Sequence, residues 1–126
     1  MGLFALEIEE LVGLYMQIEL GYGIYTSTNK KDTKEYEYIL FKRQNPKERA
    51  KLQVKTSGIN LNEYNVGDIP FYFFTLGNYY KDGKVLKEDE KEKYQKLNKV
   101  KFLTKEELLE FSKRNEKVLP YKINWF

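Results

Sequence analysis

The segment Tyr36–Lys42 constrains the fold most, because its apolar residues occupy both of the faces that a β-strand presents. Side chains alternate along a strand, so Tyr38 and Leu40 share one face while Ile39 lies on the other. A strand that is apolar on both faces is typical of the middle of a sheet with a layer on each side. The segment therefore predicts an α/β fold around a covered sheet, in a chain of 126 residues that suits one domain.

Other apolar or periodic stretches supply the remaining elements. An amphipathic helix is expected over 4–20, since apolar residues recur there at spacings of three and four. Thr104 and Glu107 match a capping box, which predicts a second helix to about residue 115. Between these helices the sequence predicts strands at 22–26, 36–42, 50–56, 71–76 and 100–103, helical turns at 60–64, and a solvated helix or loop at 86–99. We expect one domain over 1–126, either alone or within a larger protein, with a central mixed sheet of four to five strands flanked by helices and the tail 119–126 packed against it.

The residues that are missing exclude several classes of chemistry. The chain has no Cys and no His, which rules out disulfides, thiol nucleophiles, catalytic triads and zinc sites built on thiolate or imidazole. An enzyme with this composition has to use carboxylates, Lys, Arg, Tyr and Ser or Thr, with or without a hard cation. Carboxylate and carbonyl oxygens suit Mg²⁺, Mn²⁺ or Ca²⁺ rather than softer metals. The absence of Cys fits a cytoplasmic protein, and no apolar run is long enough to span a membrane. No basic n-region precedes an apolar stretch, so a secretory signal is not expected.

Three polar residues stand out in the strands. Gln53 and Lys55 are two apart in the segment 50–56, so they share a face, and Glu37 begins the preceding strand. If the two strands are neighbours, a carboxylate, an amide oxygen and an ammonium group meet at one end of the sheet, which is the chemistry of a metal-dependent phosphodiesterase. The structural alternatives for Glu37 are an exposed strand end or an ion pair across the hairpin with Lys51 or Lys55.

The order of these features resembles the PD-(D/E)XK nuclease superfamily, most closely its Mrr-type restriction endonuclease branch, in which Gln replaces an acidic residue. The resemblance covers about residues 4–57 and implies a restriction-endonuclease-like core. It implies that Glu37 and Gln53 are ligands of Mg²⁺ or Mn²⁺ and that Lys55 positions the attacking water and stabilises the phosphate charge. The branch also carries an acidic residue on its first helix, for which Glu9 matches by pattern and Glu10 is the alternative; both also fit a solvated helix face.

The function that follows is a metal-dependent nuclease that hydrolyses DNA, with RNA not excluded, in restriction or defence against foreign DNA. Lys51, Thr56 and Ser57 flank the motif and are expected to contact backbone phosphates, while Tyr79 and Tyr80 are weaker candidates for stacking on unpaired bases. A net charge of +3 is compatible with a polyanionic partner. The alternative is a non-catalytic module that binds nucleic acid or protein, and a homodimer is a further possibility for either function.

Overall fold

The computed structural model describes residues 3–29 and 36–119. Its helical elements are α1 (Leu3–Leu14), the π-helix η1 (Tyr15–Glu19), the 3-10 helix η2 (Leu61–Glu63), α2 (Glu88–Leu97) and α3 (Lys105–Arg114). Its strands are β1 (Tyr22–Asn29), β2 (Tyr36–Lys42), β3 (Arg49–Lys55), β4 (Ile59–Asn60), β5 (Phe71–Thr75), β6 (Tyr79–Lys81), β7 (Lys84–Val85) and β8 (Val100–Phe102). The tail predicted to pack back on the body lies outside the described residues from position 120.

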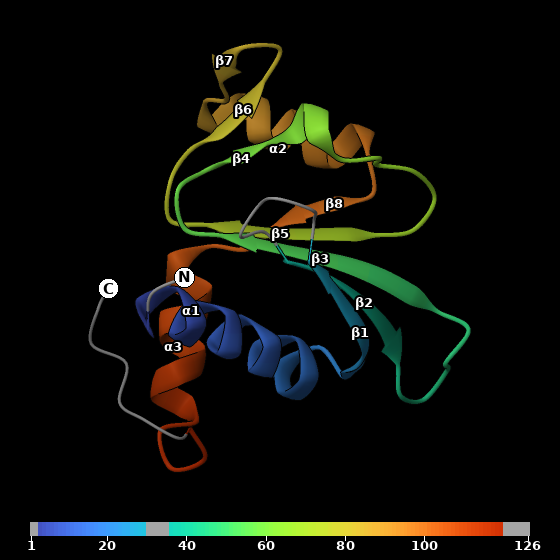
Figure 1. Ribbon diagram of the computed structural model, residues 1–126, viewed down its shortest axis with the longest axis vertical. Helices are drawn as coiled ribbons and strands as arrows, with labels where there is room; N and C mark the ends of the chain where they lie inside the picture. The colour runs from blue at the N-terminus through green and yellow to red at the C-terminus, as the bar shows by residue number, and fades with distance from the viewer. Residues whose placement is uncertain (1–2, 30–35, 120–126) are drawn as a thin grey trace.

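Five strands form the main sheet in the order β1-β2-β3-β5-β8. The first three are antiparallel neighbours, whereas β3, β5 and β8 run parallel. Helices α1 and α3 cover one face, and the other face carries α2 and a small sheet in the order β4-β6-β7 (Figure 1). The prediction of an α/β domain with a mixed sheet of four to five strands and flanking helices is thereby confirmed.

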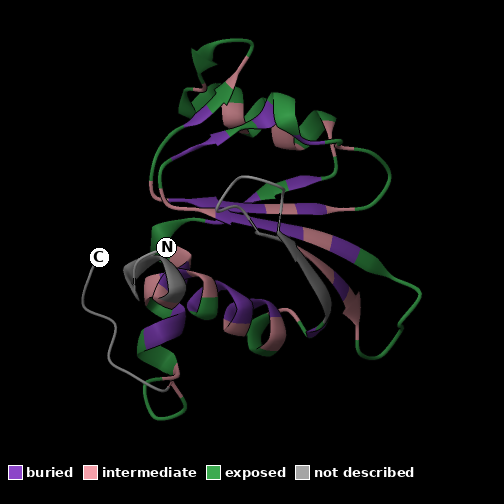
Figure 2. Ribbon diagram, in the orientation of Figure 1, coloured by how far each residue is buried: buried purple, intermediate pink, exposed green. Residues whose placement is uncertain are grey.

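One hydrophobic core fills the space between the main sheet and helices α1 and α3. Leu52 and Val54 of β3 point into it because they share one face of the strand, and both are buried. They pack with apolar residues of the two helices, among them Ile8, Leu11 and Leu108. Figure 2 shows the buried positions of the helices turned toward the sheet. The residues of α1 that pack in this core recur with the 3.6-residue period that predicted the first helix.

A second, aromatic core lies on the opposite face of β5 and β8. The rings of Phe71 and Phe73 stack with centroids 4.2 Å apart, and Tyr79 and Phe102 pack against the same cluster. The small sheet covers this cluster, and sequence analysis did not predict it. Its strands have only two or three residues each, too few for alternation to be recognised.

Strand β2 is less covered than its composition predicts. It does lie inside the sheet, with β1 on one side and β3 on the other. Tyr38 and Leu40 face the helices, but Ile39 and Phe41, on the other face, are only half-buried. The aromatic core and the small sheet are built over β5 and β8, so this part of the face is left more open by the described residues.

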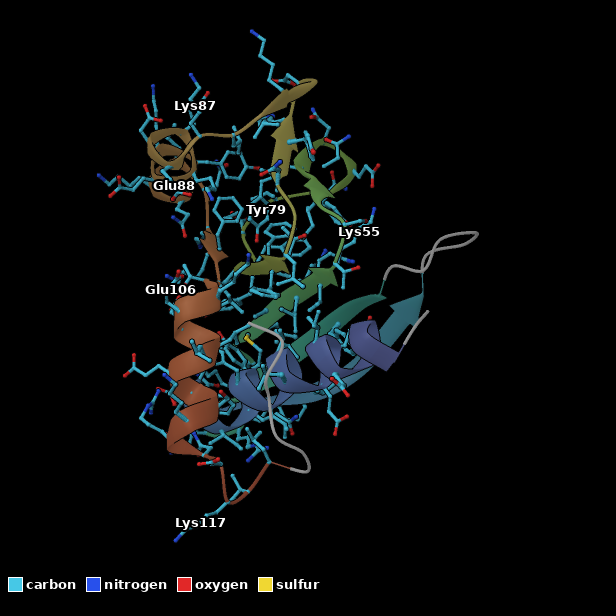
Figure 3. The ribbon with its side chains drawn as sticks, turned by 90° about the vertical axis from the view of Figure 1, so that its left-hand side faces the viewer. Lys55, Tyr79, Lys87, Glu88, Glu106 and Lys117 are labelled. Atoms are coloured by element: carbon cyan, nitrogen blue, oxygen red, sulfur yellow. The ribbon has the colours of Figure 1, made fainter. Side chains whose placement is uncertain are left out.

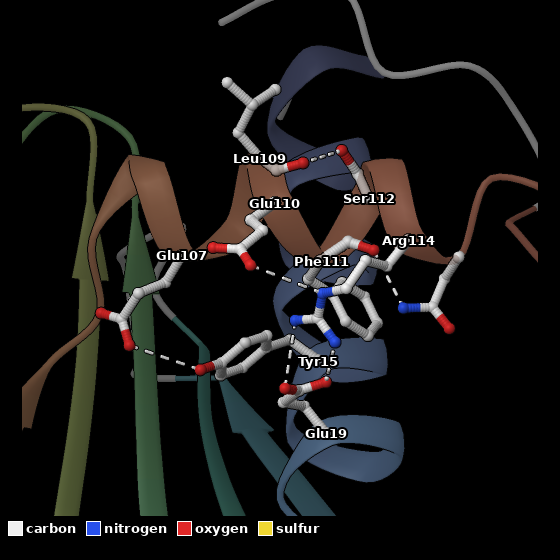
Figure 4. Close-up of polar contacts among 9 residues, drawn as sticks. Tyr15, Glu19, Glu107, Leu109, Glu110, Phe111, Ser112 and Arg114 are labelled. Carbon is white, nitrogen blue, oxygen red and sulfur yellow. Dashed lines mark hydrogen bonds and ion pairs between the residues drawn. The ribbon is translucent and has the colours of Figure 1, made fainter.

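Polar contacts join helix α3 to the π-helix η1. The hydroxyl of Tyr15 donates to Glu107 Oε2 at 3.4 Å, and Arg114 donates to both carboxylate oxygens of Glu19 at 3.1 and 3.3 Å (Figure 4). Beneath them the rings of Tyr15 and Phe111 meet edge to face at 5.4 Å. The wider turn of η1 thus presents a phenol and a carboxylate to the same helix.

This contact predicts a loss of stability in alkali. Burial, followed by the charges of Glu107 and Glu19, raises the pKa of Tyr15 to about 12. The unfolded chain loses this proton near pH 10, so the contribution of Tyr15 to stability is complete below pH 10 and is lost as the pH rises to 12. We expect Tyr15→Phe to remove part of this loss, measured by urea unfolding at pH 8 and pH 11.5. An equal difference between the two proteins at both pH values would contradict the assignment.

The outer side of β8 is the edge of the main sheet, and it is not open. The backbone amide of Phe102 donates to Gln95 Oε1 at 2.9 Å, so a side chain of α2 satisfies a group that a further strand would otherwise bind. The amide of Leu103 pairs on the inner side with the carbonyl of Phe73 at 2.8 Å. Helix α2 therefore closes this edge as well as covering the aromatic core.

Candidate functional site

The β2–β3 hairpin brings the two predicted metal ligands to one position. In the antiparallel register Glu37 lies directly opposite Gln53, and residues opposite each other share a face of the sheet. The pairing of the two strands is thus as expected. The side chain of Glu37 lies outside the described part of the chain, so its place is given by the backbone alone.

Gln53 is the unusual residue of the site, because it is a polar side chain with no exposed surface. Its amide nitrogen donates to the carbonyl of Val54 at 3.3 Å, but its Oε1 is buried and has no hydrogen-bond partner among the residues that the structure describes. An unsatisfied buried acceptor costs about 1–3 kcal/mol. The sequence thus places at this position a group that weakens the fold unless something else binds it.

Lys55 ends β3 on the same face as Gln53. In the parallel register Gln53 lies beside Phe73 and Lys55 beside Thr75, so both face the side of the small sheet. Lys55 is half-buried, and Figure 3 shows it on the side of the small sheet away from helix α2. The carboxyl ends of parallel strands β3 and β5 meet here, at a place where open α/β sheets commonly bind ligands.

The same face of β3 carries two further cations. Arg49 and Lys51 precede Gln53 at alternate positions, so Arg49, Lys51 and Lys55 form a basic row along one strand. The ammonium of Lys51 lies 5.9 Å from the ring centroid of Phe71. Sequence analysis did not single out Arg49, although the same alternation that links Gln53 to Lys55 also puts Arg49 on this face of the strand.

The structure does not bring the acidic residues of the first helix to this face. Glu9 accepts a hydrogen bond from the hydroxyl of Tyr38 at 3.3 Å, and Tyr38 packs against the core under α1. Burial raises the pKa of Glu9, and the bond from Tyr38 partly offsets this. Glu10 is exposed on the same helix. Both residues therefore lie on the far side of the sheet from Gln53.

The loop after β3 is held by direct contact between backbones. Thr56 is half-buried and Ser57 is exposed. A β-carbon added to Gly77 would lie only 2.7 Å from the carbonyl carbon of Ser57 and 2.8 Å from the amide nitrogen of Gly58. Only glycine permits this approach, which fixes the loop after β3 against the loop after β5.

Tyr79 and Tyr80 have opposite environments, and the interpretation of Tyr79 as a stacking residue is wrong. Tyr79 is buried in the aromatic core, where burial raises the pKa of its phenol. Its ring is between the small sheet and helix α2 (Figure 3), and only 5% of the residue is exposed, which is too little surface for a base to stack on. Tyr80, one residue later, points to the other face of the small sheet and is 36% exposed.

A cavity of about 730 Å³ opens between helix α2 and the start of α3, with Tyr79 in its wall. Its lining carries charges of both signs, including the ion pair of Lys91 and Glu88 at 2.7 Å. Figure 3 shows Glu88 and Glu106 on the opposite side of the small sheet from Lys55. This cavity is therefore separate from the Gln53 site.

Comparisons with family models, with curated proteins and with solved structures find no match to this chain. Among the side chains that the structure describes, which do not include that of Glu37, no three of Asp, Glu, His or Cys are grouped so that they could hold a metal ion. No helix in that part of the chain has the length and apolar character needed to cross a membrane. The candidate site thus consists of the backbone position of Glu37, the buried amide oxygen of Gln53 and the basic row of β3.

Proposed function

We propose that the protein is a metal-dependent nuclease that hydrolyses phosphodiester bonds in DNA, as the resemblance to the PD-(D/E)XK superfamily and its restriction-endonuclease-like core implies. The observation that carries the proposal is the buried, unpartnered Oε1 of Gln53, directly across the hairpin from Glu37 and two residues before Lys55. A role in restriction of foreign DNA follows from the resemblance alone.

The residues present fit a hard divalent cation. Mg²⁺ in nucleotide sites takes one or two protein oxygen ligands and fills its remaining positions with water and phosphate. Glu37 and Gln53 supply a carboxylate and an amide oxygen, and binding would satisfy the orphaned Oε1. When bound, Mg²⁺ or Mn²⁺ would lower the pKa of a coordinated water and offset phosphate charge.

The cations of the chain act on the phosphate. Lys55 lies two residues after Gln53 on the same face of β3, and its ammonium would stabilise the negative charge that develops on the non-bridging oxygens during attack by water. Lys51 lies earlier on the same strand, and Thr56 and Ser57 follow Lys55, so these residues can hold the neighbouring phosphates. No covalent intermediate is needed, in keeping with the absence of His and Cys.

The decisive change is Lys55→Ala. We expect purified wild-type protein to nick or cut DNA with Mg²⁺, and Lys55→Ala to lower the rate at least about 100-fold, the usual cost of removing one charge-stabilising donor. The exposed Lys93 of helix α2 offers a matched control, since Lys93→Ala removes the same charge far from Gln53. Cleavage that is equal in wild type and Lys55→Ala would overturn the site.

One observation favours the non-catalytic alternative, a module that binds nucleic acid. Glu9 lies on the far face of the sheet, so the acidic residue that the resemblance places on the first helix is not beside Gln53. Calorimetric titration with Mn²⁺ separates the two functions: heat that disappears in Gln53→Met supports the nuclease. DNA binding with no Mn²⁺ heat and no cleavage supports the alternative.

A further inference from the structure

The basic row of β3 lies on the face of the main sheet that also carries the small sheet. Along the small sheet, Ile59 and Tyr79 point inward and are buried, whereas Asn60 and Tyr80 point outward and are exposed. The outer face of the small sheet, which carries Asn60 and Tyr80, is thus turned away from the aromatic core. Figure 3 shows Lys55, at the end of the basic row, on the side of the small sheet away from helix α2.

Tyr80 lies close to the end of the basic row. Its Cε2 is 3.2 Å from the place where a β-carbon of residue 58 would be, so its ring packs over Gly58. Gly58 follows Lys55 by three residues, which limits their α-carbons to about 10 Å apart. Gly58 has φ +121°, a conformation that favours glycine, and a side chain there would crowd the ring.

The backbone fixes Tyr80 relative to Lys55. The amide of Ile59 donates to the carbonyl of Asn78 at 3.0 Å, two residues before Tyr80. Gly77 packs on Ser57 and Gly58 without room for a side chain, as described above. An exposed aromatic ring is thus held in place on a rigid support, which lowers the entropy lost when a flat ligand stacks on it.

We propose that Tyr80 is a stacking platform for an unpaired base, and that the substrate is a single-stranded nucleic acid whose backbone follows the basic row of β3. A polyanion is selected by Arg49, Lys51 and Lys55, and a flat ring by Tyr80. The bases of a duplex are already stacked on one another and cannot reach this ring. The proposal narrows the substrate of the proposed nuclease to single-stranded nucleic acid. It rests on the proposed nuclease function only for cleavage of that strand, not for binding it.

The test is binding measured by fluorescence anisotropy in EDTA, where no cleavage occurs. The probes are a labelled 12-nucleotide single-stranded DNA, RNA of the same sequence, and the matching DNA duplex. We expect Tyr80→Ala to weaken single-strand binding roughly 5- to 100-fold and Tyr80→Phe to change it less than about twofold. Val85→Ala, which alters the cross-strand neighbour of Tyr80, is the control and should bind as wild type does.

The outcomes separate this inference from the proposed function. Tyr80-dependent binding of the single strand, with weaker duplex binding that Tyr80→Ala leaves unchanged, supports the platform even if Mg²⁺ produces no cleavage. The platform is overturned if Tyr80→Ala leaves single-strand affinity unchanged, or if it weakens binding of the duplex equally. It is also overturned if the wild-type protein binds no single strand. Each of these results stands even if the protein cuts plasmid DNA. The RNA probe shows whether the 2′-hydroxyl matters to the platform.

Discussion

Replacing Gln53 with Met will make the protein more stable and abolish its cleavage of DNA. Met has nearly the volume of Gln and removes the buried acceptor that has no partner. The expected gain in the free energy of unfolding is about 1 kcal/mol, the low end of the cost of an unsatisfied group. Urea unfolding measures the gain in stability, and a DNA-cleavage assay with Mg²⁺ measures the loss of activity.

Two further variants sharpen this result. Leu52 is equally buried but faces the helix core, so Leu52→Met should leave cleavage intact and cost less than about 1.5 kcal/mol. Gln53→Glu should instead lower the free energy of unfolding. A buried carboxylate destabilises the metal-free fold by several kcal/mol, and Mg²⁺ should restore much of the lost stability. A Gln53→Met protein that is less stable and fully active would show that the residue is structural.

Gly77→Ala will destabilise the protein and impair both proposed activities. The new β-carbon would meet the backbone of Ser57 and Gly58 at 2.7–2.8 Å, and backbone atoms cannot rotate away as a side chain can. Overpacking of this kind costs about 1–3 kcal/mol. The two loops must separate, so Lys55 and Tyr80 lose their fixed relation, and cleavage and single-strand binding should fall together.

Gly67 provides the matched control. A β-carbon there meets no atom within 4 Å, and Gly67 is not among the glycines with positive φ. Gly67→Ala should therefore be neutral or stabilise by about 0.4–1 kcal/mol through the unfolded state. Thermal unfolding of both variants gives the comparison, and equal melting temperatures would contradict the proposed contact between the loops.

The parts of the fold that could be predicted are those encoded locally. The first helix, the hairpin of β2 and β3, and the capping box of Thr104 and Glu107 all appear as expected, because each depends on residues close in sequence. The small sheet was missed because its parallel pair of β4 and β6 joins short segments about 20 residues apart. Segments this short have no periodic pattern that would indicate the pairing of β4 with β6.

The spacing of the candidate-site residues along the strands could be predicted from the sequence, but the face of the sheet on which other residues lie could not. Alternation fixes that Gln53 and Lys55 share a face, and the hairpin fixes Glu37 opposite Gln53. Which face the first helix covers depends on how the chain crosses the sheet, and this placed Glu9 on the far side. Likewise, alternation puts Tyr79 and Tyr80 on opposite faces, but the aromatic core decides which of them is buried.

The side chain of Gln95 also limits how this protein can assemble. Because it holds the amide of Phe102, a strand from another molecule cannot add to β8 unless helix α2 is first displaced. Growth of the main sheet from copy to copy is thus blocked at one end. Any pair of chains joined by a continuous sheet would have to meet through β1, the other end of the strand order, and such a pair has no second free end from which a fibre could extend.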